Sequence, residues 1–252
     1  MIHINRNRAL EQLSNLLDNS LDKNLNYMPD NFNVQQNDAL ELLKKRIYLE
    51  EVIEESVDFN RKLNWKESSK NLKLVNSAEE LVEVFKIRSN VYAKIGYNEE
   101  CPDNIEGLNF DNYDKNSAIL YYKNDRRISG TLRLILDSEN KLPTDKKFSF
   151  NNLRKEYKTI GELSRFVVEN ESKGLSLEFK NLFAGVHTLF TNNDIDLVVT
   201  AIKKEHYKLY SKFGGTNIEK ELEGYGLVNL PFLVMSWNPS EASDFFKRAF
   251  LK

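Results

Sequence analysis

A glutamate and an arginine lie three positions apart in a stretch that otherwise predicts a buried strand. Residues 159–168 read TIGELSRFVV, with β-branched and aromatic side chains, no proline, and apolar residues on both faces. Glu162 and Arg165 interrupt this pattern, and burying a charged group is costly unless it is paired. Because positions three apart in an unbroken strand point to opposite faces, either these charges serve different faces or a bulge turns them to the same side.

Other charged residues interrupt apolar patterns elsewhere in the chain. Arg88 lies in the middle of the apolar stripe of a predicted helix, and Arg133 lies well inside a predicted strand. Asp111 and Asp114 belong to a long segment, 93–116, whose aromatic residues argue against disorder. Together with the first two charges they form a set of three arginines and three acids that could converge, and we expect Glu162 and Arg165 to be buried and ion-paired within this set. The set is either a catalytic site or a buried ion-pair network, and spacing alone gives the network the greater weight.

The sequence lacks the motifs of several common active sites. It contains neither a G-x-G-x-x-G nor a G-K-[ST] phosphate loop, and no G-x-S-x-G sequence. The three histidines are far apart and the one cysteine, Cys101, stands alone, so we expect no metal site. Cys101 also lacks an adjacent basic group and is a poor candidate nucleophile. The charged set is therefore the main candidate for chemistry.

Composition places the chain among globular intracellular proteins. With 36 basic and 38 acidic residues in 252, the net charge of −2 gives no global signature of nucleic-acid binding. A single cysteine excludes an internal disulfide framework and suits a reducing cytosol. No apolar run approaches the ~20 residues of a membrane span, and the N-terminus lacks the apolar region of a signal peptide. We therefore expect a cytoplasmic protein without integral membrane association.

The periodicity of the apolar residues predicts a mixed sheet covered by helices, which is an α/β (α+β) fold. The predicted strands are 72–75, 118–123, 128–137, 159–168, 195–202 and 230–237. The predicted helices are 5–18, 36–60, 77–92, 177–189, 203–213 and 241–250. We expect residues 1–70 to form a helical extension and residues 71–252 to form the main domain. The extension is either a structural appendage, which we favour, or a lid.

Several short motifs resemble those of two related families, the acyl-homoserine-lactone synthases and the N-acyl amino acid synthases. In chain order they are Arg88-x-x-x-Tyr92, Tyr97, Asp111-x-Tyr113-Asp114, Gly130-Thr-x-Arg133 and Glu162-x-Ser164-Arg165-Phe166. Each motif is weak alone, but the ordered set is fairly specific, and the resemblance covers roughly residues 72–240. Both families have the GCN5-related N-acetyltransferase (GNAT) fold, so the resemblance implies a GNAT-like sheet. The pyrophosphate loop usual in that fold is not recognisable after Val168, which argues against ordinary acetyl-CoA chemistry.

The resemblance implies transfer of a fatty acyl group from a thioester to the amine of a small, amino-acid-type acceptor. The donor would be an acyl carrier protein or acyl-CoA cosubstrate, with no tightly bound cofactor. The catalytic residues implied are Glu162 as base, Arg165, and Asp111 or Asp114 to hold the acceptor ammonium or orient the loop. The substrate-binding residues implied are Arg88, Tyr92, Tyr97, Arg133 and Phe166. A basic patch for the acidic carrier would consist of Lys146, Lys147, Arg154, Lys155 and Lys158, although these could also be a solvated loop.

Some alternatives stay open at the level of the sequence. The acyl chain would need an apolar slot beside Phe166, Phe179, Phe183 and Phe190, yet helical aromatics are more often plain core. A second hypothesis is a homoserine-lactone synthase that uses S-adenosylmethionine. A third, of another class, is a non-catalytic binding module of the same fold with residues 1–70 as its interaction surface.

Overall fold

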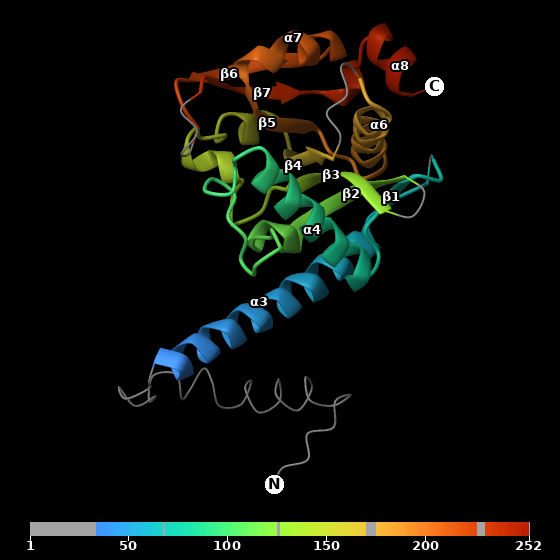
Figure 1. Ribbon diagram of the computed structural model, residues 1–252. Coiled ribbons are helices and arrows are strands. Elements are labelled where there is room, and N and C mark those ends of the chain that lie inside the picture. Colours follow the sequence, from blue (N-terminus) through green and yellow to red (C-terminus); the bar gives the residue numbers. More distant parts are fainter. Residues whose placement is uncertain (1–33, 68, 125–126, 170–174, 226–229, 252) are drawn as a thin grey trace. The chain divides into compact units, whose positions relative to one another are not determined.

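Seven strands form one mixed sheet in the part of the chain that the computed structural model describes, residues 34–67, 69–124, 127–169, 175–225 and 230–251 (Figure 1). Their spatial order is β1-β2-β3-β4-β5-β7-β6. The strands are β1 Leu72–Leu74, β2 Ser117–Asn124, β3 Arg127–Leu136, β4 Ile160–Val168, β5 Leu197–Lys203, β6 Thr216–Leu222 and β7 Phe232–Trp237. Neighbours are antiparallel except β4 and β5, which are parallel.

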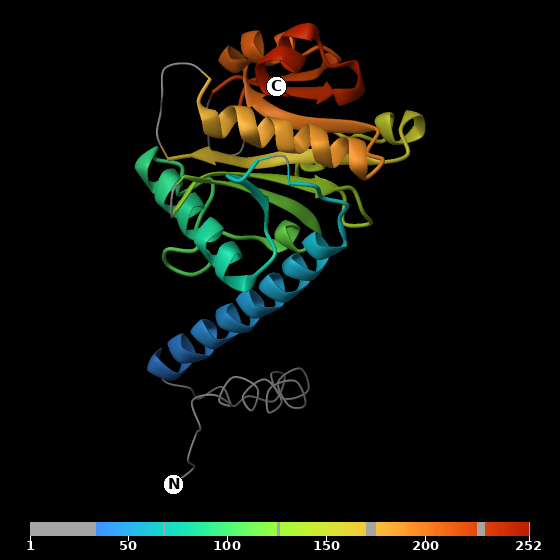
Figure 2. The same ribbon diagram turned by 90° about the vertical axis from the view of Figure 1, so that its right-hand side faces the viewer.

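Helices cover both faces of this sheet (Figure 2). The helices are α3 Val34–Lys62, α4 Ala78–Lys94, α5 Leu153–Glu156, α6 Leu177–Asn192, α7 Tyr207–Tyr210 and α8 Asp244–Phe250. Alternate residues of β3 point to opposite faces, so Leu132 and Leu134 pack in the cluster of α6 while Arg133 points to the side of α4. These features confirm the predicted mixed sheet flanked by helices.

Helix α4 begins where the sequence predicts it. The Ser77 hydroxyl accepts a hydrogen bond from the backbone N–H of Glu80 at 3.3 Å. The Glu80 carboxylate reaches back one residue further than in a standard capping box and accepts the N–H of Asn76 at 2.8 Å. Both bonds satisfy backbone N–H groups at the start of the helix. The position of this start determines which residues of α4 face the sheet, and Arg88 is one of them.

Strand β4 contains the bulge that the sequence allowed as one of two alternatives. Arg133 of β3 lies opposite Ser164, but Thr131 lies opposite Val167, so β4 has one residue more than β3 over this interval. The extra residue falls at Arg165, whose φ of 51° is in the left-handed region. The bulge changes the alternation of side chains, and Arg165 thereby reaches the same carboxylate as Arg133.

Strands β4 and β5 separate beyond the first residues of their ladder. Their pairing runs from Ile160 opposite Leu197 to Glu162 opposite Val199, although β4 continues to Val168. Beyond Glu162 a side-chain hydrogen bond still connects the two strands: the Thr200 hydroxyl of β5 donates to the carbonyl oxygen of Leu163 in β4 at 3.0 Å. The splay leaves one edge of β4 without β5 as its partner in the segment that carries the bulge.

The chain groups into two compact units, residues 1–51 and 52–252. In the second unit, Asn60 of α3 donates to the carbonyl oxygen of Ser117 at 2.8 Å and accepts the N–H of Ile119 at 2.9 Å. These bonds tie the end of α3 to β2, so residues 52–62 group with the sheet. The predicted helix at 5–18 lies outside the described residues, and the functional division at residue 70 stays a prediction.

The structure differs from the sequence-based prediction at several other elements. Strand β6 was not predicted; its exposed, highly charged side chains at the edge of the sheet give no apolar pattern. The helix predicted at 203–213 is split into the 3-10 turn Lys204–His206, α7 and the 3-10 turn Ser211–Phe213. The closing helix starts at Asp244 rather than 241, because Ser243 is its N-cap. No helix among the described residues is long and apolar enough to cross a membrane.

Candidate active site

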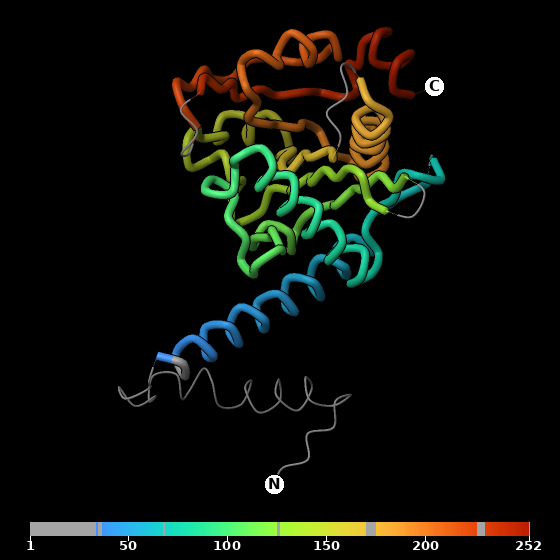
Figure 3. The backbone as a smooth tube through the Cα atoms, in the orientation of Figure 1, coloured from blue at the N-terminus to red at the C-terminus, as the bar shows by residue number. Residues whose placement is uncertain are grey.

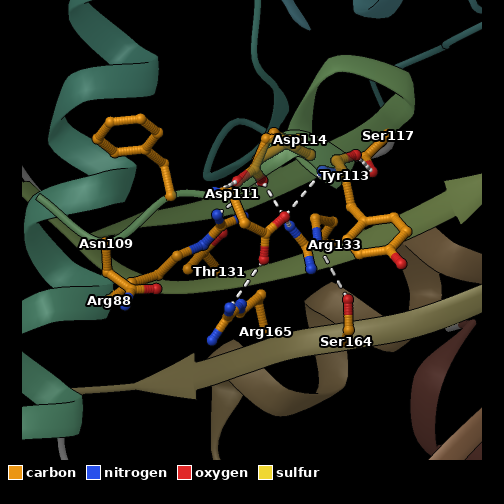
Figure 4. A network of polar contacts seen from close by, with 12 residues as sticks. Arg88, Asn109, Asp111, Tyr113, Asp114, Ser117, Thr131, Arg133, Ser164 and Arg165 are labelled. Carbon is orange, nitrogen blue, oxygen red and sulfur yellow. Dashed lines mark hydrogen bonds and ion pairs between the residues drawn. The ribbon is translucent and has the colours of Figure 1, made fainter. Parts of the chain in front are cut away.

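Two arginines share one aspartate in the interior between α4 and the sheet (Figure 4). Arg88 Nη1 lies 2.8 Å from Asp114 Oδ1, and Arg133 Nη1 lies 3.1 Å from the same oxygen. The side chains of Arg88 and Asp114 are 0% exposed and that of Arg133 is 2% exposed. The other oxygen of Asp114 accepts the N–H of Asp111 at 2.9 Å. Asp114 therefore joins α4, β3 and the 3-10 turn Asn112–Asn116 in one buried network.

Asp111 connects this network to the bulge. Its Oδ1 lies 2.6 Å from Arg133 Nη1, and its Oδ2 lies 2.8 Å from Arg165 Nη2 (Figure 4). Burial alone would raise the pKa of this carboxyl, but the charges of Arg133 and Arg165 prevail and hold the pKa well below its usual range. Asp111 is thus ionised at neutral pH, and as a proton acceptor it is far too weak.

Glu162 lies near the network but is held differently. Its residue is 3% exposed, and its carboxylate accepts two hydrogen bonds from Thr144, the backbone N–H at 3.0 Å and the hydroxyl at 2.8 Å. The expected ion pair with an arginine is not formed: among the described residues Glu162 has no salt bridge within 4.0 Å. Burial raises the pKa of Glu162 to about 7, although the bonds from Thr144 and the charge of Arg133 oppose the rise.

A cavity of about 840 Å³ opens over these residues, along β4 and β5 where the two strands separate. Its charged end is lined by Asp111, Arg133, Glu162, Arg165 and Lys146. Its apolar part is lined by Leu132, Leu163, Phe166, Phe183, Phe213, Met235 and Trp237. Of the other candidates, Tyr92 and Tyr97 also line it, whereas Arg88 and Asp114 lie behind the wall. Cys101 lines the cavity too, but burial raises the pKa of its thiol, which makes it a poor nucleophile.

Aromatic rings build the wall of the apolar part. Phe166 packs edge-on against Phe183 with ring centroids 5.8 Å apart, and Phe183 contacts Phe213 at 5.4 Å. Phe179 packs behind Phe166 at 5.5 Å, and Phe190 belongs to the core cluster. Of the four aromatic residues predicted to form a slot, Phe166 and Phe183 line the cavity and Phe179 and Phe190 do not, and the role of this cavity as an acyl slot stays a prediction.

Two tyrosines from the predicted motifs make cation–π contacts with basic side chains. The guanidinium of Arg165 lies 5.6 Å from the ring centroid of Tyr92, and Lys203 Nζ lies 5.2 Å from that of Tyr97. Tyr92 lies in α4 and Tyr97 lies just after the C-terminal end of that helix, and both add aromatic surface to the lining of the cavity.

A family model for the N-acyl amino acid synthase FeeM matches residues 83–238, which contain the cavity and the network. The chain belongs to the FeeM family of N-acyl amino acid synthases. This family is one of N-acyltransferases, enzymes that use an acyl thioester as donor and an amine as acceptor. The assignment confirms the resemblance of the motif set to the N-acyl amino acid synthases.

Solved structures agree with this family at the level of the fold. FeeM, an N-acyl amino acid synthase from uncultured soil microbes, is 20% identical with a TM-score of 0.54, covering 71% of this chain and 94% of its own. The acyl-homoserine-lactone synthase LasI is 16% identical with a TM-score of 0.50 over 71% and 93%. The CoA-dependent lactone synthase BjaI is 17% identical with a TM-score of 0.50 over 68% and 81%. A comparison with curated proteins finds no significant match.

The basic segment of this family member divides into two kinds of residue. Arg154 is engaged internally, with Nε 2.6 Å from Asp137 Oδ2 and Nη2 2.5 Å from Asp145 Oδ2. Its ion pairs hold the β3–β4 connection together, and its predicted part in carrier docking stays a prediction. Lys147, Lys155 and Lys158 are exposed. Lys146 is also exposed and lies 6.0 Å from the ring centroid of Tyr113 at the cavity.

Three site residues of this family member had no individual prediction from the sequence. Ser164 accepts from Arg133 Nε at 3.0 Å, and its place in the Glu162–Arg165 motif was the signal that could have identified it. Thr144 contacts Glu162, and Tyr225 contacts Thr144, only because the β3–β4 connection and the segment after β6 come together, which no local pattern reveals. The described residues contain no group of three or more side chains suited to bind a metal.

Proposed function

We propose that the chain transfers a fatty acyl group from a thioester to the amine of an amino acid, with Glu162 as general base. One observation supports this proposal most: a buried carboxylate, its pKa raised to about 7, borders a cavity with a charged end and an aromatic, apolar part. A base works best when its pKa lies near the working pH, and among the described acids of this cavity Glu162 fits that requirement.

The reaction needs one proton transfer before the new bond can form. The acceptor ammonium gives a proton to the Glu162 carboxylate, directly or through a water, and the freed amine nitrogen attacks the thioester carbonyl carbon. The carbon–sulfur bond of the resulting intermediate then breaks, and the thiolate leaves with the electron pair and takes up the second proton, which the nitrogen gives up as the amide forms. Glu162 returns its proton to solvent before the next cycle.

The separation of β4 from β5 supports a place for the developing oxyanion. Beyond Glu162 the ladder to β5 ends, and backbone N–H groups at such an edge can donate to a carbonyl oxygen that gains negative charge. The thioester would lie along this edge with its acyl chain among Leu163, Phe166 and Phe183, whose side chains line the cavity. Apolar contact of that kind favours a fatty acyl group over a short polar one.

The acceptor would bind at the charged end. Arg165 keeps 17% of its side chain exposed and lines the cavity, so its guanidinium is the best placed of the three to meet an acceptor carboxylate. Arg88 is fully buried, so its role is to hold Asp114. Arg133 and Asp111 orient Arg165, and Tyr92 and Tyr97 supply an aromatic surface for the rest of the acceptor.

The identity of the thioester carrier belongs to the same proposal. Lys147, Lys155 and Lys158 form an exposed basic group on the connection that follows β3, and an acidic acyl carrier protein has the complementary charge. A CoA thioester is the other possible donor, and it would not need these three lysines.

The proposal is tested by incubating the full chain with acyl carrier protein thioesters or acyl-CoA and a mixture of amino acids. Mass spectrometry should detect N-acyl amino acids, and Glu162→Gln should abolish their formation. Absence of any acylated product with either donor would overturn the proposal. Release of methylthioadenosine from S-adenosylmethionine would instead identify a lactone synthase.

A further inference from the structure

The Glu162 carboxylate is the first member of a chain of three hydrogen-bonded side chains. Thr144 Oγ1 donates to Glu162 Oε1 at 2.8 Å, and the backbone N–H of Thr144 donates to Oε2 at 3.0 Å. The same hydroxyl lies 3.1 Å from the hydroxyl of Tyr225. Thr144 is 0% exposed, whereas Tyr225 lines the cavity. This series of hydrogen bonds therefore runs from the Glu162 carboxylate, through the buried Thr144, to Tyr225 at the cavity where substrates would bind.

The direction of these bonds follows from the number of protons available. An ionised carboxylate can only accept hydrogen bonds, so the single proton of the Thr144 hydroxyl goes to Glu162. The Tyr225 hydroxyl must then donate to Thr144. Tyr225 is itself held by a stacked contact with Phe232, whose ring centroid lies 5.3 Å away at an interplanar angle of 27°.

The turn that carries Thr144 is fastened independently of the cavity. It is the 3-10 turn Pro143–Lys146 in the connection between β3 and β4, which Figure 3 traces. Asp145 accepts the N–H of Leu142 at 3.0 Å and that of Phe150 at 3.1 Å. Arg154 then joins Asp145 to Asp137 at the end of β3. This clasp fixes the backbone on both sides of Thr144, so both of its donors are aimed at Glu162 in advance.

We infer that Thr144 and Tyr225 are positioning residues for the transfer reaction: Thr144 orients the Glu162 carboxylate, and Tyr225 fixes the direction of the Thr144 hydroxyl. The inference rests on the proposed role of Glu162 as base. When Glu162 takes up the acceptor's proton, its new O–H can donate to Thr144 Oγ1, and the Thr144 proton can turn to the oxygen of Tyr225. The two bonds between the three side chains then reverse without displacement of a heavy atom, the Tyr225 proton turns away from Thr144, and the backbone N–H of Thr144 continues to donate to Oε2.

The charged groups around Glu162 determine how its pKa should change when the hydrogen bond from the Thr144 hydroxyl is removed. Arg133 of β3 favours the ionised carboxylate, whereas Asp145 of the same turn disfavours it. Tyr113 of the neighbouring turn and Tyr225 face it as neutral phenols whose own pKa values are raised, by burial above all. The bonds from Thr144 stabilise the ionised form, so removing the hydroxyl should raise the pKa of Glu162.

The test compares Thr144→Val with Thr144→Ser in the full chain. Valine keeps the shape and the backbone N–H but removes the hydroxyl, whereas serine keeps the hydroxyl. Carboxyl titration by ¹³C NMR without substrate should show the Glu162 pKa about one pH unit higher in Thr144→Val. Because the ionised fraction at pH 7 then falls from about half to about a tenth, kcat/KM at pH 7 should fall about fivefold. Thr144→Ser should restore both values.

Tyr225→Phe and a distant control complete the test. Tyr225→Phe should raise the Glu162 pKa by less than Thr144→Val does, since the direct donor remains. Thr188→Val, which removes a hydroxyl bonded to Ala184 inside α6, should leave the titration unchanged. If Glu162 titrates in folded Thr144→Val as in the parent protein, the inference is overturned. If the shift occurs but Glu162→Gln keeps full activity, Glu162 is not the base. The hydrogen bonds from Thr144 and Tyr225 then have no catalytic role.

Discussion

Glu162 differs from the other acids of the site in how its charge is compensated. Asp111 and Asp114 are paired directly with guanidinium groups, whereas Glu162 accepts its two hydrogen bonds from the neutral Thr144. The network of Arg88, Arg133 and Arg165 with two aspartates carries one excess positive charge. Ionisation of Glu162 would balance that charge, so the network favours the ionised base while burial favours the neutral acid.

The raised pKa of Glu162 predicts a pH-dependent stability. In the folded protein its pKa is about 7, against 4.5 for the free group, so between these values the folded state holds a proton that the unfolded state has released. Stability contributed at this site is therefore present below pH 4.5 and is lost as the pH rises to 7. Glu162→Gln, which cannot ionise, should raise the free energy of unfolding at pH 8 by up to about 3 kcal/mol.

Urea unfolding at pH 4.5 and pH 8 measures this effect. The difference between Glu162→Gln and the parent protein should be larger at pH 8 than at pH 4.5. An equal difference at the two pH values would contradict the raised pKa.

The backbone of Arg165 gives a second prediction at the scale of the residue. Its φ of 51° is unfavourable for side chains with a Cβ, and least tolerable for a β-branched one. Arg165→Val and Arg165→Gly both lose the ion pair to Asp111, but glycine relaxes the backbone. Arg165→Val should therefore be less stable than Arg165→Gly by about 1–2 kcal/mol, measured by urea unfolding, and both should lose activity. Equal stability of the two would argue against a bulge at this residue.

At the scale of the element, Asp114 joins helix α4 to the sheet. Asp114→Asn would leave Arg88 and Arg133 buried with one carboxylate fewer, which should cost about 3–5 kcal/mol of unfolding free energy. The control is Asp58→Asn, which breaks an exposed pair with Arg61 of 4.0 Å and should change stability by less than about 1 kcal/mol. Chemical denaturation measures both variants. Similar losses in the two would mean that the buried network does not fasten α4.

The sequence predicts elements best where apolar periodicity is strong. Strand β4, its bulge as one alternative, and the start of α4 follow from local patterns and capping. Edge strand β6 has no such pattern, since its side chains face water. The partner of Glu162 was predicted wrongly for a related reason: Thr144 lies in a turn without periodicity, and only the folded β3–β4 connection brings it under the carboxylate. A charged residue within an apolar stretch therefore indicates where a site lies, but it does not predict which residues contact that charge in the folded protein.

At the scale of the whole molecule, the exposed lysines predict a difference between donors. Replacing Lys147, Lys155 and Lys158 together by Glu should raise KM for an acyl carrier protein thioester about tenfold or more and leave KM for the acyl-CoA within about twofold. The reason is that like charge on the connection would repel the acidic carrier.

A matched control makes the same change of charge on other elements. Lys86, Lys208 and Lys220 are also exposed, on α4, α7 and β6, and their replacement by Glu should leave both KM values unchanged. Equal effects of the two triple variants would indicate general electrostatics rather than a docking surface.

The pH dependence of kcat/KM for acyl transfer tests the central claim most directly, because it reports the ionisation of the base in the free enzyme. The parent protein should show an acid limb with an apparent pKa of about 7, the value set by the burial of Glu162. Glu162→Gln should lose activity by about a hundredfold or more and show no limb at that pH. A Glu162→Gln variant that keeps both the rate and the limb near pH 7 would contradict the account.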